Sequence, residues 1–261
     1  MSNDPYHHIE VLLSSAKPDE IRQGLELVRK EIARVGSQEA RPLFELVSSL
    51  FYFDPLDRPD LVPVLDEAIS LVVGFGEWVI PELLSELEDG DFKVQLAVGQ
   101  ALGRMGADAI RPLLAEYASS QDGALRTFVL YALGKIKSPR IIEALPLALE
   151  AVHSPDHEMR DTATRALGKF AESLTPGQVP AEMRREMIER LQYNLADTSP
   201  AIRAKAVRSL GKMAKFGHLE ADERERLKGI LQRIMGTDED YEWDRAYVVR
   251  REAEEAFQYV G

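Results

Sequence analysis

Cysteine is absent from this chain of 261 residues. Disulfides, cysteine-ligated zinc or iron–sulfur sites and a cysteine nucleophile are therefore excluded. Long apolar runs are missing too, and the longest, such as residues 69–75, are far too short to span a bilayer. The first ten residues, MSNDPYHHIE, have no basic start and no apolar core, so a secretory signal is not expected. These absences predict a cytoplasmic protein that does not enter a membrane.

Positive charge is scarce as well. The chain has 32 Lys and Arg against 44 Asp and Glu, a net charge of −12. Because proteins bind nucleic acids mainly by neutralising phosphates, this balance counts against a general DNA-binding or RNA-binding protein. Residues 160–235 are the exception, with 15 Lys and Arg against 10 Asp and Glu, a local net charge of +5. Nucleic-acid binding through residues 160–235 therefore stays open as an alternative.

An internal repeat dominates the sequence. Four segments share one pattern. A capping residue stands four positions before a polar residue, and a glycine stands eight positions after that polar residue. An apolar residue precedes the polar one, and a small or β-branched residue follows it by three positions. The four copies are DFKVQLAVGQALGRM from Asp91, DGALRTFVLYALGKI from Asp122, DHEMRDTATRALGKF from Asp156 and SPAIRAKAVRSLGKM from Ser199.

Each copy predicts a pair of helices. The side chain of the capping residue accepts the unpaired backbone N–H groups at the start of the first helix. The Leu-Gly sequence near the end of that helix invites a left-handed C-cap, although a helix that continues past the glycine is the alternative. A second amphipathic helix follows. Such a pair cannot bury its apolar face alone, so neighbouring pairs stack into an α-solenoid. We expect one continuous domain over residues 1–261, with about six helix pairs plus a terminal helix and the clearest repeats at 91–236.

The repeated frame D-x-x-[VLMI]-R-x-x-[AV]-x-x-A-L-G, with a following L-x-x-x-L helix, resembles the HEAT-repeat superfamily. It is most similar to the bacterial variety called PBS-lyase HEAT-like, and the copies within 91–236 match better than the flanks. The resemblance implies an all-α fold, a right-handed superhelix of stacked antiparallel helix pairs. Proteins of this family are mostly interaction scaffolds, but some are phycobilin lyase subunits, alkylpurine DNA glycosylases or a di-iron hydroxylase. Family membership therefore implies the fold more strongly than the function.

Three short motifs look like metal-binding or catalytic motifs, but their places in the repeat indicate structural roles. His157-Glu158 lies beside the helix cap, where Glu158 suits the positive end of the helix dipole, so we expect no metal site. Ser209-x-x-Lys212 has the spacing of a nucleophile motif, but Ser209 occupies the small column of the repeat and is expected to be buried. The acidic run at 237–244 lacks the glycine and glutamate of a calcium loop and predicts only an acidic loop.

The residue after each repeat glycine is a cation. Since stacked helices lie roughly 8–10 Å apart, these equivalent positions are expected to form a ladder of positive charge. One interpretation is that the cations complement helix dipoles; the other is that they bind an acidic partner surface. The candidate ladder, widened by two arginines one turn earlier, comprises Arg104, Lys135, Lys169, Lys212, Arg165 and Arg208.

The sequence therefore predicts a non-catalytic scaffold that binds another protein with an acidic surface. We expect no catalytic residue, no metal and no cofactor, and the sequence does not predict an oligomeric state. Two alternatives remain: a phycobilin lyase subunit or chromophore chaperone, implied by the resemblance, and nucleic-acid binding through the basic segment.

Overall fold

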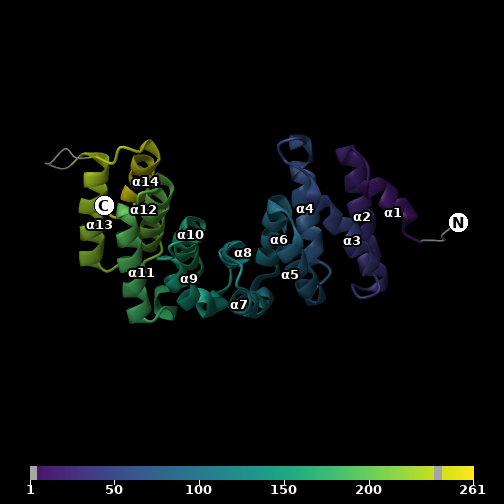
Figure 1. Ribbon diagram of the computed structural model, residues 1–261, viewed down its shortest axis with the longest axis horizontal. Coiled ribbons are helices and arrows are strands. Elements are labelled where there is room, and N and C mark those ends of the chain that lie inside the picture. Colours follow the sequence, from purple (N-terminus) through teal and green to yellow (C-terminus); the bar gives the residue numbers. More distant parts are fainter. Residues whose placement is uncertain (1–4, 238–242) are drawn as a thin grey trace. The chain divides into compact units, whose positions relative to one another are not determined.

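The computed structural model describes residues 5–237 and 243–261 of the chain. Within these residues the chain forms fourteen α-helices and no strand, which confirms the predicted all-α class (Figure 1). The helices are α1 (His7–Leu13), α2 (Pro18–Val35), α3 (Pro42–Ser48), α4 (Val62–Val73), α5 (Ile80–Asp89), α6 (Phe92–Met105), α7 (Ile110–Ser119), α8 (Gly123–Leu133), α9 (Leu145–Ala151), α10 (His157–Ser173), α11 (Ala181–Tyr193), α12 (Pro200–Lys215), α13 (Ala221–Met235) and α14 (Tyr247–Phe257).

The helices cluster into two compact units, Met1–Leu113 and Leu114–Gly261, with the boundary inside α7. In the first unit α2, α4 and α6 pack in succession, and α3 and α5 pack against α4 and α6. In the second unit α8, α10, α12 and α14 pack in succession as one layer, which α9, α11 and α13 cover. This is the stacked arrangement of an α-solenoid, as predicted. The right-handed sense and the single continuous domain stay predictions.

The helix starts follow the sequence pattern at all four central repeats, and three of the four capping side chains make the predicted bonds. Asp91 and Asp122 each accept two backbone N–H groups of the following turn, and Asp156 accepts that of Met159 at 2.8 Å. Ser199 is the N-cap residue of α12, but its side chain makes no such bond, so that part of the prediction is wrong. Its own backbone N–H donates to Asp197 Oδ1 at 2.8 Å.

The repeat glycines do not end their helices in a left-handed conformation. Gly103, Gly168 and Gly211 lie inside α6, α10 and α12, and Gly134, which caps α8, has a φ of −65°. A Cβ atom on Gly168 would lie 2.8 Å from the Cβ of Ser209, and one on Gly211 would lie 2.7 Å from the Cβ of Ala256. Gly168 and Gly211 therefore allow close approach between successive helices of the layer. No repeat glycine forms the left-handed C-cap, and at Gly103, Gly168 and Gly211 the helix continues past the glycine, which was the alternative.

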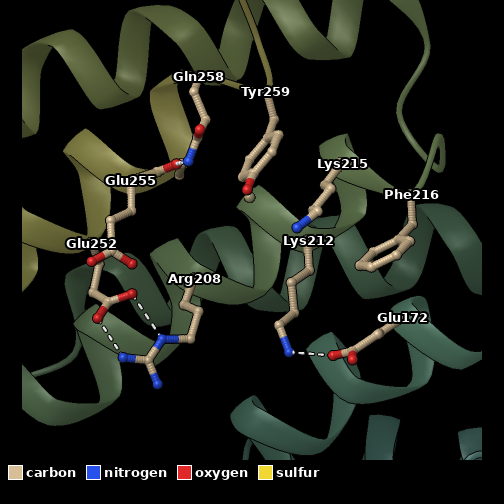
Figure 2. A pocket seen from close by; sticks show the side chains of 11 residues that line it. Glu172, Arg208, Lys212, Lys215, Phe216, Glu252, Glu255, Gln258 and Tyr259 are labelled. Atoms are coloured by element: carbon tan, nitrogen blue, oxygen red, sulfur yellow. Dashed lines mark hydrogen bonds and ion pairs between the residues drawn. The ribbon is translucent and has the colours of Figure 1, made fainter.

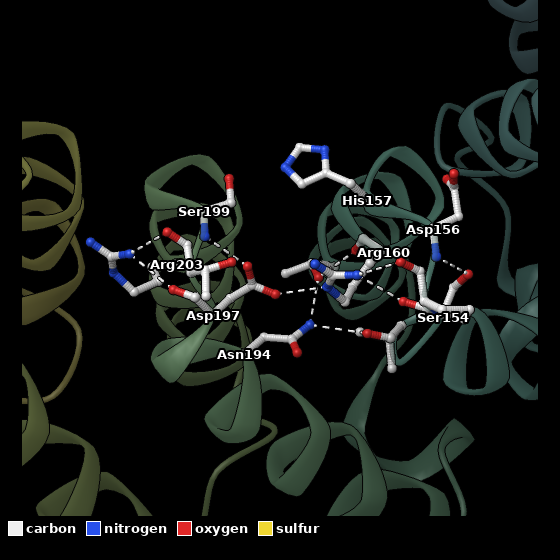
Figure 3. A network of polar contacts seen from close by, with 12 residues as sticks. Ser154, Asp156, His157, Arg160, Asn194, Asp197, Ser199 and Arg203 are labelled. Carbon is white, nitrogen blue, oxygen red and sulfur yellow. Dashed lines mark hydrogen bonds and ion pairs between the residues drawn. The ribbon is translucent and has the colours of Figure 1, made fainter.

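Two repeat arginines, Arg160 and Arg203, tie neighbouring helix pairs together, and Figure 3 shows Arg160 beside Asp197. Arg160 Nε lies 2.7 Å from Asp197 Oδ2, and Arg160 Nη1 donates to the carbonyl of Ser154 at 2.8 Å. One pair further on, Arg203 donates to the carbonyl of Asp197 at 2.9 Å and to both carboxylate oxygens of Asp244. Each arginine therefore binds backbone next to its own helix and a carboxylate in the next pair.

No single helix in the described part of the chain is long and apolar enough to cross a membrane. One pair bent by 111°, Pro59–Val73 with Glu77–Asp89, passes the same test of length and composition. The side chains of Val64, Ile69, Leu83 and Leu87 in this pair are buried in the core of the first unit. The predicted cytoplasmic location stays a prediction.

The close approach at Gly168 predicts a clear stability effect. Gly168→Ala should lower the free energy of unfolding by about 1–2 kcal/mol, because the new methyl group meets the backbone and side chain of Ser209. Gly229→Ala in α13 is the control, since a Cβ there meets nothing within 4 Å and should raise stability by up to about 1 kcal/mol. Urea unfolding of the three proteins measures both changes, and equal values for the two variants would contradict this role of Gly168.

The link between Arg160 and Asp197 predicts a pH dependence. Burial raises the pKa of Asp197, but the hydrogen bonds from Arg160 and from the N–H of Ser199 outweigh it and leave the pKa below its usual value. A lowered pKa in the folded state adds stability above the unfolded pKa of about 3.9, and this stability is lost as the pH falls through the folded pKa.

Asp197→Asn should therefore cost about 2 kcal/mol at pH 7 and progressively less below about pH 4. Asp222→Asn breaks an ion pair whose side chains are 63% and 66% exposed and should cost less than about 1 kcal/mol at either pH. Urea unfolding at pH 7 and at pH 3 tests the pair of variants. If Asp197→Asn lowered the free energy of unfolding equally at both pH values, the stabilisation would not depend on the ionised carboxylate of Asp197.

Candidate interaction surface

The predicted ladder cations fall into both units. Arg104 lies on α6 in the first unit, where it donates to the side chains of Asp66 and Ser70 and, at 2.9 Å, to the carbonyl of Asp66. The remaining five lie in the second unit on or directly after α8, α10 and α12. Because these five cations lie in one unit, the structure defines their positions relative to one another. They are Lys135, Arg165, Lys169, Arg208 and Lys212. Their role in binding stays a prediction.

Between α12 and α14, the carboxylate of Glu252 pairs with the ladder cation Arg208. Arg208 Nε donates to Glu252 Oε2 at 2.8 Å, and the second guanidinium arm binds the other oxygen (Figure 2). Glu252 is only 3% exposed, so this bidentate pair shields a buried charge. Beside it lies a cavity of about 310 Å³, where Lys215 Nζ sits 5.0 Å from the ring centre of Tyr259 and 5.7 Å from that of Phe216.

Between α10 and α12, one carboxylate serves two lysines. Glu172 Oε2 lies 3.0 Å from Lys169 Nζ on its own helix and 2.7 Å from Lys212 Nζ on the next helix. Burial raises the pKa of Glu172, but the two lysines outweigh it and hold the pKa at about 2. Burial lowers the pKa of Lys212, an effect that the bond to Glu172 opposes and the charge of Lys169 reinforces.

Between α8 and α10 lies a small groove whose lining is basic and apolar. The groove of about 20 Å³ is lined by Lys135, Arg165 and Lys169 with Tyr131, Thr162 and the apolar groups of Leu130, Gly134 and Ala166, and none of these lining residues is Asp or Glu. Lys135 Nζ lies 4.8 Å from the ring centre of Tyr131. Burial raises the pKa of Tyr131 while the positive charge of Arg165 opposes the rise. Arg165 is exposed and has no ion-pair partner within residues 5–237 and 243–261.

The two bridging carboxylates were missed by the sequence analysis. Glu172 follows Lys169 by three positions, the spacing of side chains that meet on one helix, and this signal was available. Glu252 lies in a repeat whose glycine has been lost, where the position matching Gly211 is not marked by the pattern. Only the packing of α12 on α14 reveals that Glu252 faces Arg208.

The His157-Glu158 and Ser209 motifs lie at the structural positions that the repeat predicts for them. His157 and Glu158 occupy the first turn of α10, with exposed side chains 3.3 Å apart. No group of three or more His, Asp or Glu side chains in the described residues could hold a metal ion. Ser209 is 2% exposed and donates to the carbonyl of Thr164 at 2.8 Å, which confirms it as a buried small residue. The acidic run at 237–244 lies largely outside the described residues.

Most cations of the basic segment are already neutralised. At least ten of its fifteen Lys and Arg form ion pairs with carboxylates of the same chain, which leaves few to neutralise phosphates. This pairing argues against the nucleic-acid alternative. The ten paired cations are Arg160, Lys169, Arg184, Arg190, Arg203, Lys205, Arg208, Lys212, Arg226 and Lys228.

Comparison with known proteins identifies the repeats. The family model described as HEAT repeats matches residues 80–168, which confirms the predicted resemblance to the HEAT-repeat superfamily over that part of the chain. Comparison with curated proteins gave no match.

Two solved structures show the same architecture. The chain from the complex of CpcE and CpcF of phycocyanin lyase from Nostoc sp. PCC7120 has a TM-score of 0.54 and 19% identity, over 69% of this chain and 99% of that one. An engineered protein has a TM-score of 0.51 and 18% identity, over 98% of this chain and 96% of the other. At these identities the similarity shows the fold alone.

The shared carboxylate at Glu172 predicts how Lys212 titrates. In Glu172→Gln the pKa of Lys212 should fall further below the usual lysine value, because burial and Lys169 still act and the opposing negative charge is gone. NMR titration of the lysine side chains measures the shift. Glu225→Gln, beside Lys228 on an exposed face of α13, is the control and should leave Lys212 unchanged. An unchanged pKa in Glu172→Gln would mean that Glu172 is not its main counter-ion.

Proposed function

We propose that this protein is a non-catalytic scaffold that holds another protein on the layer formed by α8, α10, α12 and α14. The observation that carries the proposal is the groove between α8 and α10. Cations of successive repeats converge there, and no carboxylate lines it. The positive charge of exposed Arg165, next to apolar surface in this groove, favours a partner that supplies the opposite charge.

The partner is accordingly a protein with an acidic surface. The cations that the chain needs for its own stability are paired internally, whereas exposed Arg165 is not. Repeat layers of this kind bind partners along an extended surface without a deep pocket. The solved chain from Nostoc is itself part of a complex of two different proteins, which supports a binding role for this fold.

A lyase subunit that handles a phycocyanin chromophore is the second candidate. The solved phycocyanin lyase complex favours it, since 99% of that chain aligns with this one. The groove at α8 and α10, about 20 Å³, is far too small for a chromophore, and the cavity of about 310 Å³ at α12 and α14 is at the lower limit for small-molecule sites. Co-expression with bilin and a phycobiliprotein acceptor tests it, and uncoloured acceptor would exclude it.

The scaffold proposal predicts the loss of a partner on charge reversal at one position. Arg165→Glu should abolish capture of a specific protein that wild type retains in a pull-down from source-cell lysate, read by mass spectrometry. Arg185→Glu, on α11, is the matched control: it changes the net charge equally, and Arg185 is also exposed and has no ion-pair partner in the described part of the chain. The control should retain the partner.

Circular dichroism and urea unfolding should show both variants to be folded, since both side chains are exposed. The scaffold proposal requires at least one protein that wild type and Arg185→Glu both capture and that Arg165→Glu does not. If no such protein is found, the proposal is overturned.

A further inference from the structure

Two repeat arginines of the second unit use their guanidinium groups in the same way. Arg160 donates from Nη1 to the carbonyl of Ser154, and Arg203 donates from Nη1 to a carbonyl at the equivalent place, that of Asp197. Each carbonyl lies two positions before the N-cap residue of the helix that carries the arginine. The Nε atom of each arginine lies 2.7 Å from a carboxylate that precedes the next helix of the layer, Asp197 or Asp244. Both arginines therefore bind one carbonyl of their own helix pair and one carboxylate of the next.

The two carboxylates are held by the same local turn. Asp197 Oδ1 accepts the N–H of Ser199 at 2.8 Å, and Asp244 Oδ1 accepts that of Ala246 at 2.8 Å. Ser199 and Ala246 are the N-cap residues of α12 and α14. Such a turn fixes the carboxylate at the start of the helix, where it faces the preceding arginine. The acid that these arginines accept is thus an aspartate two positions before a helix cap.

Arg250 of α14 is the next arginine of this series. Its Nη1 donates to the carbonyl of Asp244 at 2.7 Å, again two positions before the N-cap residue of its helix. Its Nε and Nη2 atoms have no hydrogen-bond or ion-pair partner within residues 5–237 and 243–261. The bonds from Arg203, more than the charge of Arg250, hold the pKa of Asp244 below its usual value, and both carboxylate oxygens of Asp244 bind Arg203. Arg250 therefore has its carbonyl but lacks its carboxylate among the described residues.

Two exposed aromatic rings lie against the guanidinium of Arg250. Its Cζ atom lies 5.0 Å from the ring centre of Trp243 and 6.0 Å from that of Tyr247. Trp243 is 64% exposed and Tyr247 71% exposed, and the neighbouring Val248 is 42% exposed. Arginine, tryptophan and tyrosine are the residue types that contribute most to binding at protein interfaces. The donors of Arg250 thus lie within an apolar surface of the kind that a partner protein covers.

We propose that Arg250 binds an aspartate of another protein, one that directly precedes a helix of that protein, while Trp243 and Tyr247 pack against the apolar residues around it. A carboxylate matches the planar donor pair of Nε and Nη2, and docking removes the exposed rings from water. The bond then repeats across the interface the geometry that Arg160 and Arg203 show inside the chain. This inference goes beyond the proposed function and does not rest on the groove at Arg165.

A peptide with the same local turn tests the inference. The probe carries Asp-Thr-Ser-Pro, the sequence that holds Asp197, ahead of an alanine-rich helix, and the matched peptide carries Asn-Thr-Ser-Pro. The chain has two tryptophans, so the indole N–H signals in NMR report on Trp243 and, as a reference in the other unit, on Trp78. The aspartate peptide should shift the signals of Trp243 and of the Arg250 Nε–H and leave Trp78 unchanged. The asparagine peptide should bind at least about fivefold more weakly.

Three variants separate the guanidinium from its surroundings, at about 0.15 M salt to screen general charge effects. Arg250→Gln should weaken binding of the aspartate peptide at least about fivefold, because the charge and the planar donor pair are lost. Arg245→Gln removes the same charge from an exposed position nearby and should leave the affinity unchanged. Tyr247→Ala should weaken binding about two- to fivefold through the lost ring. Its side chain is exposed, so this variant decides the question if circular dichroism shows that Arg250→Gln does not fold.

Four outcomes overturn the proposal. The first is equal affinity for the two peptides, or equal binding by wild type, Arg250→Gln and Tyr247→Ala. The second is a loss shared by Arg245→Gln, which would be a general charge effect. The third is a wild-type self-association, measured by sedimentation, that Arg250→Gln abolishes, because a second copy would then supply the acid.

The fourth outcome concerns the acidic run of the chain itself. Replacing the acids at 238–242 by their amides should leave the Nε–H signal of Arg250 unchanged in the absence of peptide. A shift of that signal would mean that the chain supplies its own carboxylate. The pull-down with Arg165→Glu reads the proposed function alone, so either conclusion can fail while the other stands.

Discussion

Close approach of successive helices is the constraint on which the second unit depends. Gly168 lies against Ser209 and Gly211 against Ala256, with no room for a further carbon at either contact. Small residues at these crossings allow the helix axes to lie at the short end of the usual range. Only at that separation can the carboxylate of Glu172 reach lysines on two helices at once. The electrostatics of the surface are therefore a result of backbone packing.

The repeat arginines perform a different task from the cations after the glycines. Arg160 and Arg203 are largely buried and bind carbonyl groups and carboxylates at the seams between pairs. Their positive charges are neutralised by these partners inside the protein. A local excess of Lys and Arg in the sequence thus reflects in large part how the helix pairs are held together.

The sequence predicts what is repeated and fails where the structure departs from the repeat. The helix class, the caps at Asp91, Asp122 and Asp156 and the burial of Ser209 follow from column patterns, because each depends on a residue's place in its own unit. The sequence did not decide between a capping and a packing glycine, since a glycine near a helix end looks the same in either case. Glu252 and the bond from Glu172 to Lys212 were missed because these partners lie on neighbouring helices, and pairing across helices is set by tertiary packing.

The early end of α8 has a consequence for how such surfaces arise. Its neighbour α10 continues past the glycine and so carries Glu172, which pairs with Lys169 of the same helix and with Lys212 of the next. A helix that ends at its repeat glycine presents no helical side chain at the position where α10 carries Glu172. In a repeat protein the length of one helix can thus change which charged side chains reach the neighbouring helix, copy by copy along the stack.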